Sequence, residues 1–166
     1  MLIIFCAELE EAKNIKCSDA LILITGVGYN NIIKTMPRLS LKPEDKIINI
    51  GYAGSNKYVV GSVVSVDKAC KLNTSPILNG QNIKLKPCYL KGDVCYTADN
   101  FIEQARDEVA LVDMELYYLA LVYPQIQSIK IVSDNLDIEE HRAFDLSESW
   151  ELVNKILAEV KKVKYG

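Results

Sequence analysis

The sequence predicts a single α/β domain over residues 1–166, built on a central mixed, largely parallel twisted sheet that is flanked by helices. The length of 166 residues is that of one ordinary domain. Short, almost wholly apolar runs, such as 1–7 and 20–24, are typical of strands that are covered on both faces. Helix-like segments separate several of these runs, which is the alternation expected of an α/β protein.

Composition indicates an ordinary soluble protein and excludes several classes. The hydrophobic fraction of 49% and the charged fraction of 25% lie in the usual globular range. The first apolar run lacks a basic start and meets Glu8, Glu10 and Glu11 almost at once, which fits neither a signal peptide nor a membrane span. We therefore expect a cytoplasmic protein with no membrane partner.

Cysteine content and charge argue against metal, disulfides and nucleic acid. The five cysteines are an odd number without a CxxC pair, and His141 is the single histidine. The net charge of −3 comes with basic residues spread along the chain, so no cationic stripe is present to neutralise a phosphate backbone. We expect no metal, no cofactor and no nucleic-acid partner.

The first half of the chain alternates apolar runs with glycine-containing segments. After the run 20–24, the residues TGVG at 25–28 predict a turn into a helix that ends at Pro37. The run 46–50 predicts a strand that ends in a small-residue loop, GYAGS.

The middle of the chain is less regular. The β-branched residues 59–66, interrupted by one glycine, predict a pair of strands. Residues 67–92 mix Asn, Pro, Gly and Lys with short apolar stretches, and we interpret them as loops and edge strands.

The second half predicts three further strands and two helices. The strands are expected at 94–97, 111–112 and 128–132. Apolar residues at helical spacing predict helices over 113–123, ended by Pro124, and over 147–165, with a short acidic helix or turn over 101–110.

The polar and small residues of this pattern follow the predicted strands, where ligands bind in α/β sheets. Taken in order, the segments TGVG, INIGYAGS, YTADNFI, VDMELYYLALV and IVSDNLD resemble the methylthioadenosine/S-adenosylhomocysteine nucleosidases and their nucleoside phosphorylase relatives. The matches extend from the first strand to residue 145. The resemblance implies a phosphorylase/hydrolase-like fold that cleaves the N-glycosidic bond of a purine nucleoside.

By this resemblance, Asp134 is the general acid that protonates N7 of the purine, so that the base leaves neutral. General acid catalysis contributes about 10²- to 10⁴-fold in rate and requires a carboxyl in a partly buried place. Without the other segments, Asp134 fits a helix N-cap equally well.

The resemblance assigns the ribose to two neighbouring residues. Met114 would pack beneath the sugar, and Glu115 would accept hydrogen bonds from its 2′ and 3′ hydroxyls. A carboxylate has two acceptor oxygens and suits a vicinal diol. The alternative for Glu115 is an acidic residue at the start of a helix.

Comparison with the family pattern places Glu11 at the position of the water-activating base, with Glu10 as the neighbouring alternative. A carboxylate there would take a proton from water and stabilise positive charge on the ribose. A solvated acidic turn is the competing interpretation.

The remaining site residues are assigned by the same resemblance. Phe101 would stack on the purine and the backbone of Ile102 would bind its edge, although a core phenylalanine is the other account of Phe101. The TGVG and GYAGS loops, with Gly28 and Tyr52, would line the ribose and nucleophile side. Ser133 would line the site beside Asp134.

The choice between water and phosphate as nucleophile depends on the arginines. Arg38, Arg106 and Arg142 all lie outside the segments where the phosphorylase relatives hold phosphate. Water is therefore the expected nucleophile, and a purine nucleoside phosphorylase is the alternative. His141 is expected in a loop or at a helix start.

Two departures from the family pattern keep a noncatalytic nucleoside-binding protein as a further alternative. Tyr52 is bulky where many relatives carry a small residue, so it would narrow the pocket or donate a hydrogen bond. The chain is also shorter than the family enzymes, between Glu11 and the strand 20–24 and again over 67–96.

Relatives form dimers or hexamers, so we expect a homodimer or a higher homo-oligomer.

Overall fold

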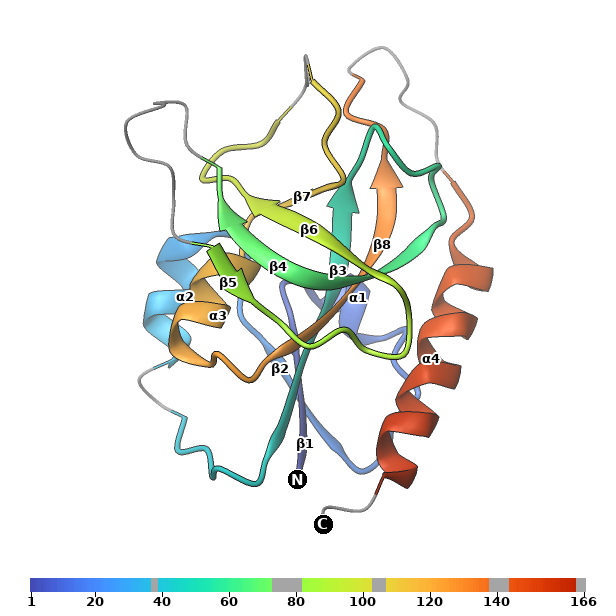
Figure 1. The fold of residues 1–166 in the computed structure, drawn as a ribbon. Coiled ribbons are helices and arrows are strands. Elements are labelled where there is room, and N and C mark those ends of the chain that lie inside the picture. The colour runs from blue at the N-terminus through green and yellow to red at the C-terminus, as the bar shows by residue number, and fades with distance from the viewer. Residues whose placement is uncertain (37–38, 73–81, 103–106, 138–143, 164–166) are drawn as a thin grey trace.

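The computed structural model describes residues 1–36, 39–72, 82–102, 107–137 and 144–163 (Figure 1). Its strands are β1 (Leu2–Cys6), β2 (Ala20–Ile24), β3 (Lys46–Gly54), β4 (Val63–Lys71), β5 (Asn82–Lys84), β6 (Gly92–Thr97), β7 (Leu111–Asp113) and β8 (Gln127–Asp134). Its helices are α1 (Leu9–Ala12), α2 (Tyr29–Thr35), α3 (Leu116–Val122) and α4 (Ser147–Lys162).

The predicted α/β class is confirmed, but the sheet is closed into a barrel. Strand β3 pairs with β7, β7 with β6, β6 with β4, β4 with β8, and β8 returns to β3. The sheet continues outward from the barrel through β1 and β2, and β5 lies at the edge of β4. The prediction of a largely parallel twisted sheet did not include this closure.

The sheet is mixed, as predicted. Within the described residues, the β3–β7, β4–β5 and β4–β8 pairs are antiparallel and the other pairs are parallel. The long strands β3 and β4 each pair with three neighbours, along different parts of their length. This closure depends on pairing between distant segments, which hydropathy does not show.

Helices cover the barrel on two sides (Figure 1). Helix α4 lies along one side, where Trp150, Val153 and Leu157 pack on Ile129 and Ile131 of β8. Helices α2 and α3 lie together on the other side. No helix in the described part of the chain is long and apolar enough to cross a membrane.

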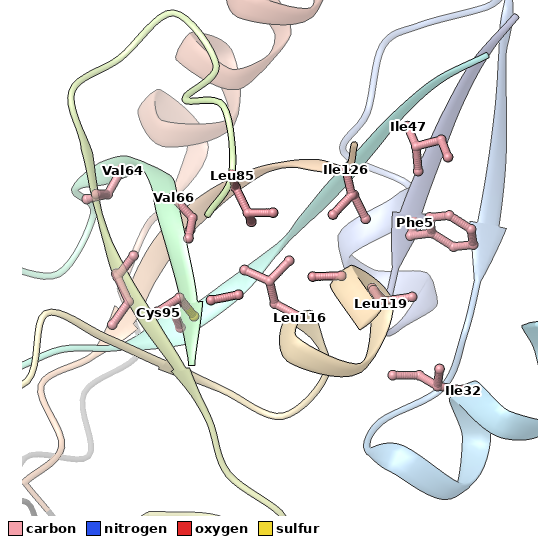
Figure 2. Close-up of a cluster of buried hydrophobic side chains, with 14 of the residues drawn as sticks. Phe5, Ile32, Ile47, Val64, Val66, Leu85, Cys95, Leu116, Leu119 and Ile126 are labelled. Atoms are coloured by element: carbon pink, nitrogen blue, oxygen red, sulfur yellow. The ribbon is translucent and has the colours of Figure 1, made fainter. Parts of the chain in front are cut away.

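A second core cluster joins the barrel interior to α2 and α3. Figure 2 shows Leu116 and Leu119 of α3 among side chains from several strands, with Cys95 of β6 on the side of Leu116 and Ile32 of α2 at the edge. All of these side chains are buried. This packing places the N-terminus of α3 at the end of β7.

Several local predictions need correction. Residues 51–54 were expected to form a loop, but they continue β3, because Tyr52 and Ala53 pair with β8 and Gly54 pairs with Val112 of β7. A Cβ at Gly54 would meet Leu136 Cδ2 at 2.3 Å, so a glycine permits this close approach.

The expected strand pair over 59–66 is instead a turn followed by the single strand β4. Gly61 in that turn has φ +92°, which favours glycine. The helix expected over 101–110 is absent from its described residues, 101–102 and 107–110. Pro37 and residue 165, the expected ends of two helices, lie outside the described residues.

Candidate active site

A cavity of about 310 Å³ lies at the carboxyl ends of several strands. It collects segments that are far apart in the sequence: the turn after β1, the ends of β3, β7 and β8, and the loop after β6. Eight of the nine predicted site residues line it: Glu11, Tyr52, Phe101, Ile102, Met114, Glu115, Ser133 and Asp134.

Glu11 is buried and held by main-chain donors. Its Oε2 accepts hydrogen bonds from the N–H groups of Ala7 and Glu8, at 2.8 and 3.1 Å, and its Oε1 accepts one from the N–H of Tyr52 at 3.0 Å. Glu11 stands at the third residue of α1, where a glutamate can reach back to the N–H of the residue before the helix. Three donors therefore fix the carboxylate against the cavity.

Glu10, the alternative to Glu11, lies on the other side of the short helix. Its carboxylate is exposed and pairs with Lys13 at 2.5 Å. Glu10 does not line the cavity, so the structure brings only Glu11 to the other candidate residues.

Glu115 is buried just before α3, with its carboxylate on the cavity. The N–H of Gly28 donates to Oε1 at 3.1 Å, and the N–H of Met114 donates to Oε2 at 3.2 Å. Burial, and then the nearby carboxylate of Asp113, raise the pKa of Glu115 to about 7. Glu115 therefore changes charge near neutral pH.

Gly28 contributes through its backbone. Its φ of +83° suits glycine, and its N–H supports Glu115 from the turn between β2 and α2. Gly28 lines a second cavity, of about 550 Å³, rather than the first. The two cavities share Val27 and Met114 in their walls.

Asp134 ends β8 and is half-buried at the cavity. Its Oδ1 accepts a hydrogen bond from the N–H of Leu136 at 3.1 Å, and Leu136 itself has φ +59°. This local turn holds the carboxyl without a helix, because residues 135–137 are not helical. The N-cap alternative therefore does not describe Asp134.

The hydroxyl of Ser133 donates a weak hydrogen bond to Asp134 Oδ2 at 3.4 Å. Phe101 borders the cavity with a side chain that is 70% exposed, so it is not a core phenylalanine. Ile102 packs on the small cluster that contains Val112 and Leu136.

Tyr52 lines the cavity, but its hydroxyl lies elsewhere. That hydroxyl accepts a hydrogen bond from Nε1 of Trp150 at 3.0 Å, and the two rings meet edge to face at 5.8 Å. The ring packs in the cluster beneath α4. The donor that Tyr52 supplies at the site is its main-chain N–H, to Glu11.

The sequence analysis gave no role to Asp113 or Lys130, which form a buried ion pair at 2.8 Å behind Glu115. A signal was present. Lys130 interrupts the apolar run 129–132 of β8, and a charge buried in a sheet requires a partner. The three arginines that bear on phosphate binding, and the single histidine, lie outside the described residues: Arg38, Arg106, Arg142 and His141.

No family model matches the sequence, and no curated protein matches it. Solved structures do. An MTAN from Chlamydia trachomatis superposes with a TM-score of 0.72 at 18% identity, over 95% of this chain and 97% of that one.

Two proteins from Helicobacter pylori are also similar in structure over nearly the whole chain. A 5′-methylthioadenosine/S-adenosylhomocysteine nucleosidase, solved with butyl-thio-DADMe-Immucillin-A, gives a TM-score of 0.75 at 15% identity and covers 98% of both chains. A futalosine hydrolase gives 0.74 at 15% identity, over 98% of this chain and 97% of that chain. The chain therefore has the nucleoside phosphorylase/nucleosidase fold. Within that fold, these neighbours are nucleosidases and a hydrolase.

Proposed function

We propose that this protein is a purine nucleoside N-ribohydrolase, similar to the methylthioadenosine/S-adenosylhomocysteine nucleosidases. One observation carries the proposal. A single cavity of about 310 Å³ is lined by three carboxyl side chains from separate segments, Glu11, Glu115 and Asp134, and also by Met114. The fold neighbours, which their names describe as nucleosidases and a futalosine hydrolase, support the same class.

Asp134 acts on the leaving base in this proposal. Its protonated carboxyl gives a proton to N7 of the purine while the bond between the base nitrogen and C1′ breaks. The electron pair of that bond leaves with the base, and a positively charged ribosyl group remains. The turn through Leu136 holds the carboxyl where it borders the cavity.

Glu11 acts on the water. Its carboxylate takes one proton as the water oxygen bonds to C1′, which yields the free purine and the free sugar. The three N–H donors on Glu11 keep the carboxylate from turning away. A fixed negative charge there also stabilises the positive ribosyl group.

Glu115 binds the sugar. Its ionised form accepts hydrogen bonds from the 2′ and 3′ hydroxyls, while Gly28 and Met114 donate to it from behind. Binding therefore requires Glu115 to be charged. With the pKa of Glu115 raised to about 7, activity is expected to fall as the pH drops below neutral.

The acidic cavity favours water over phosphate. The carboxylates of Glu8, Glu11 and Glu115 line it with Asp134, whose carboxyl is protonated in this proposal, and its described lining residues include no Lys, Arg or His. Phosphate would meet like charges there, with no cation to bind it. Phosphorolysis is the alternative activity that the assay below separates.

The assay measures base release from methylthioadenosine, S-adenosylhomocysteine and futalosine, each with and without phosphate. We expect release without phosphate, and a loss of about 10²- to 10⁴-fold in the Asp134→Asn variant. Asp137→Asn, an exposed neighbour, is the matched control and should retain the native rate. Glu11→Gln should lower the rate, whereas Glu10→Gln should not.

Three results separate the alternatives. Strict dependence on phosphate would establish a phosphorylase. Binding of a nucleoside by calorimetry, without release of base from any substrate, would establish a noncatalytic binding protein. Folded protein that neither binds nor cleaves any of these nucleosides would reject the proposal.

We further propose a cytoplasmic homo-oligomer. The apolar side chains of Tyr29 and Ile33 on α2, and of Leu121 and Val122 on α3, are exposed on the side of the barrel away from α4. A second copy of the chain would cover them. Light scattering of the purified protein should give at least twice the mass of one chain, and a monomer would contradict this.

A further inference from the structure

Lys130 is the largest fully buried charged side chain among the residues that the structure describes. It lies in the middle of β8, where Ile129 and Ile131 face the cluster beneath α4. Because successive side chains of a strand point to opposite faces, Lys130 points to the inside of the barrel. Its side chain is only 1% exposed.

Inside the barrel, Lys130 binds one carboxylate. Its Nζ donates to Oδ2 of Asp113 at 2.8 Å, and the side chain of Asp113 is fully buried. The other oxygen of Asp113 accepts a hydrogen bond from the hydroxyl of Thr97 at 2.6 Å. The pair is therefore sealed between β6, β7 and β8.

The same network holds the first turn of α3. The N–H of Leu116 donates to Oδ2 of Asp113 at 2.9 Å, and the N–H of Tyr117 donates to the hydroxyl oxygen of Thr97 at 2.9 Å. Glu115 lies between Asp113 and these two anchored residues. Its direction toward the cavity is thus set by bonds that converge on Asp113.

Stability does not account for Lys130. A buried ion pair is often no more stabilising than well-packed apolar side chains of the same volume, because both charges lose their water. Its surroundings are otherwise negative or thiol-bearing: Asp113 on β7, Glu115 before α3, Cys95 on β6 and Cys6 on β1. Glu11 on α1 also acts on Glu115 from across the cavity.

We propose that Lys130 is a positioning residue of this site, which acts on Glu115 through Asp113 by holding the turn that aims the Glu115 carboxylate and by balancing the negative charges around it. The inference rests on the proposed function. Lys130 does not line the cavity, so its effect on substrate passes through Asp113 and Glu115.

The charge on Lys130 should shift the pKa of Glu115 in a direction that can be measured. Asp113 raises the pKa of Glu115 and Lys130 lowers it. Removing the Lys130 charge alone should therefore raise the pKa of Glu115 further and keep it protonated to higher pH. The acidic limb of the rate profile should move upward with it.

The test measures kcat/KM for base release against pH in the native protein, Lys130→Met and Lys130→Arg. We expect the acidic midpoint of Lys130→Met to rise by about one pH unit or more, since an opposite charge at this range shifts a pKa by about 1–3. Lys130→Arg keeps the charge and should restore the native midpoint. Lys161→Met removes an exposed lysine paired with Asp19 and should leave the midpoint unchanged.

Two further variants keep the test decisive if Lys130→Met does not fold. Asp113→Asn and the double variant Asp113→Asn/Lys130→Met differ only at residue 130, which is lysine in the first and methionine in the second, and neither leaves an unpaired carboxylate. We expect the midpoint of the double variant to lie above that of Asp113→Asn. Equal midpoints in both comparisons, with only a pH-independent loss of rate, would overturn the proposal.

A direct titration separates this inference from the proposed function. Carbon-13 NMR of protein labelled at the glutamate side chains follows the Glu115 carboxyl without any substrate. Failure of turnover with a Glu115 titration that still shifts in Lys130→Met would reject the function and keep the inference. Turnover by the native protein, with a Glu115 titration that does not shift in Lys130→Met, would keep the function and reject the inference.

Discussion

Strands β3 and β8 separate two interiors of opposite character. On one face, the isoleucines Ile48, Ile50, Ile129 and Ile131 pack with Trp150 and the apolar side of α4. On the other face of the same strands lie polar groups: Asn49 of β3, and Ser128 and Lys130 of β8. The interior beneath α4 is apolar at these positions, whereas the barrel interior combines these polar groups with the apolar cluster that reaches α2 and α3.

The polar interior is closed by its own partners. The hydroxyl of Ser128 donates to Oδ1 of Asn49 at 3.0 Å, and Lys130 pairs with Asp113 at 2.8 Å. Such groups contribute little net stability, but they are costly if one partner is removed. The comparison teaches that both faces carry apolar clusters that supply stability, while the polar groups of the barrel face also fix the direction of the side chains that reach the cavity.

The largest expected effect on stability lies beneath α4. Leu157→Ala removes a side chain that is 1% exposed and leaves a void, so we expect the free energy of unfolding to fall by about 2–5 kcal/mol. Denaturant unfolding measures this loss. Because Leu157 is remote from the cavity, the folded variant should keep its rate of base release.

Leu152→Ala is the matched control on the same helix. Leu152 is 40% exposed, and its truncation should cost far less. Equal losses for the two variants would contradict the view that the apolar cluster beneath α4 is a main source of stability.

The second effect has the opposite sign and concerns Glu115. Its pKa is raised from 4.5 to about 7, so between these values the folded protein holds a proton that the unfolded chain releases. Stability is therefore lost as the pH rises through this window. Glu115→Gln should be more stable than the native protein at pH 8, by up to about 3 kcal/mol, while losing ribose binding.

Unfolding at about pH 4.5 and at pH 8 checks this sign. The gain should shrink to a small remainder at the lower pH, where Glu115 is protonated in the folded protein and about half protonated in the unfolded chain. A Glu115→Gln variant that is less stable at pH 8 would show that the carboxylate is stabilised, and not strained, in the folded protein.

The smallest effect lies at the boundary between the two interiors. Tyr52→Phe removes the hydroxyl that accepts from Trp150 at 3.0 Å, so we expect the free energy of unfolding to fall by about 1 kcal/mol. The comparison Trp150→Phe removes the donor from the other side. A double variant that costs less than the sum of the two single ones would confirm that the two changes break the same bond.

The candidate site was more predictable than the sheet. Asp134, Glu115 and Glu11 were assigned from ordered segments at strand ends, and the structure brings all three to one cavity. Barrel closure was not predicted, because it depends on β3 meeting both β7 and β8 through residues 51–54, whose glycines and small side chains suggest a loop. Local composition carries no record of such pairing.

Sequence by itself determined the α/β class and most strand positions, because hydropathy period is a local property, and the resemblance of its short motifs to a known family predicted the candidate site residues. Only the tertiary structure decided which glutamate faces the cavity, where the Tyr52 hydroxyl goes, and that Lys130 lies paired with Asp113 behind Glu115. Those outcomes depend on burial and on partners that are distant in the chain. The role of a buried charge such as Lys130 can be inferred only when its partner, here Asp113 on another strand, is known.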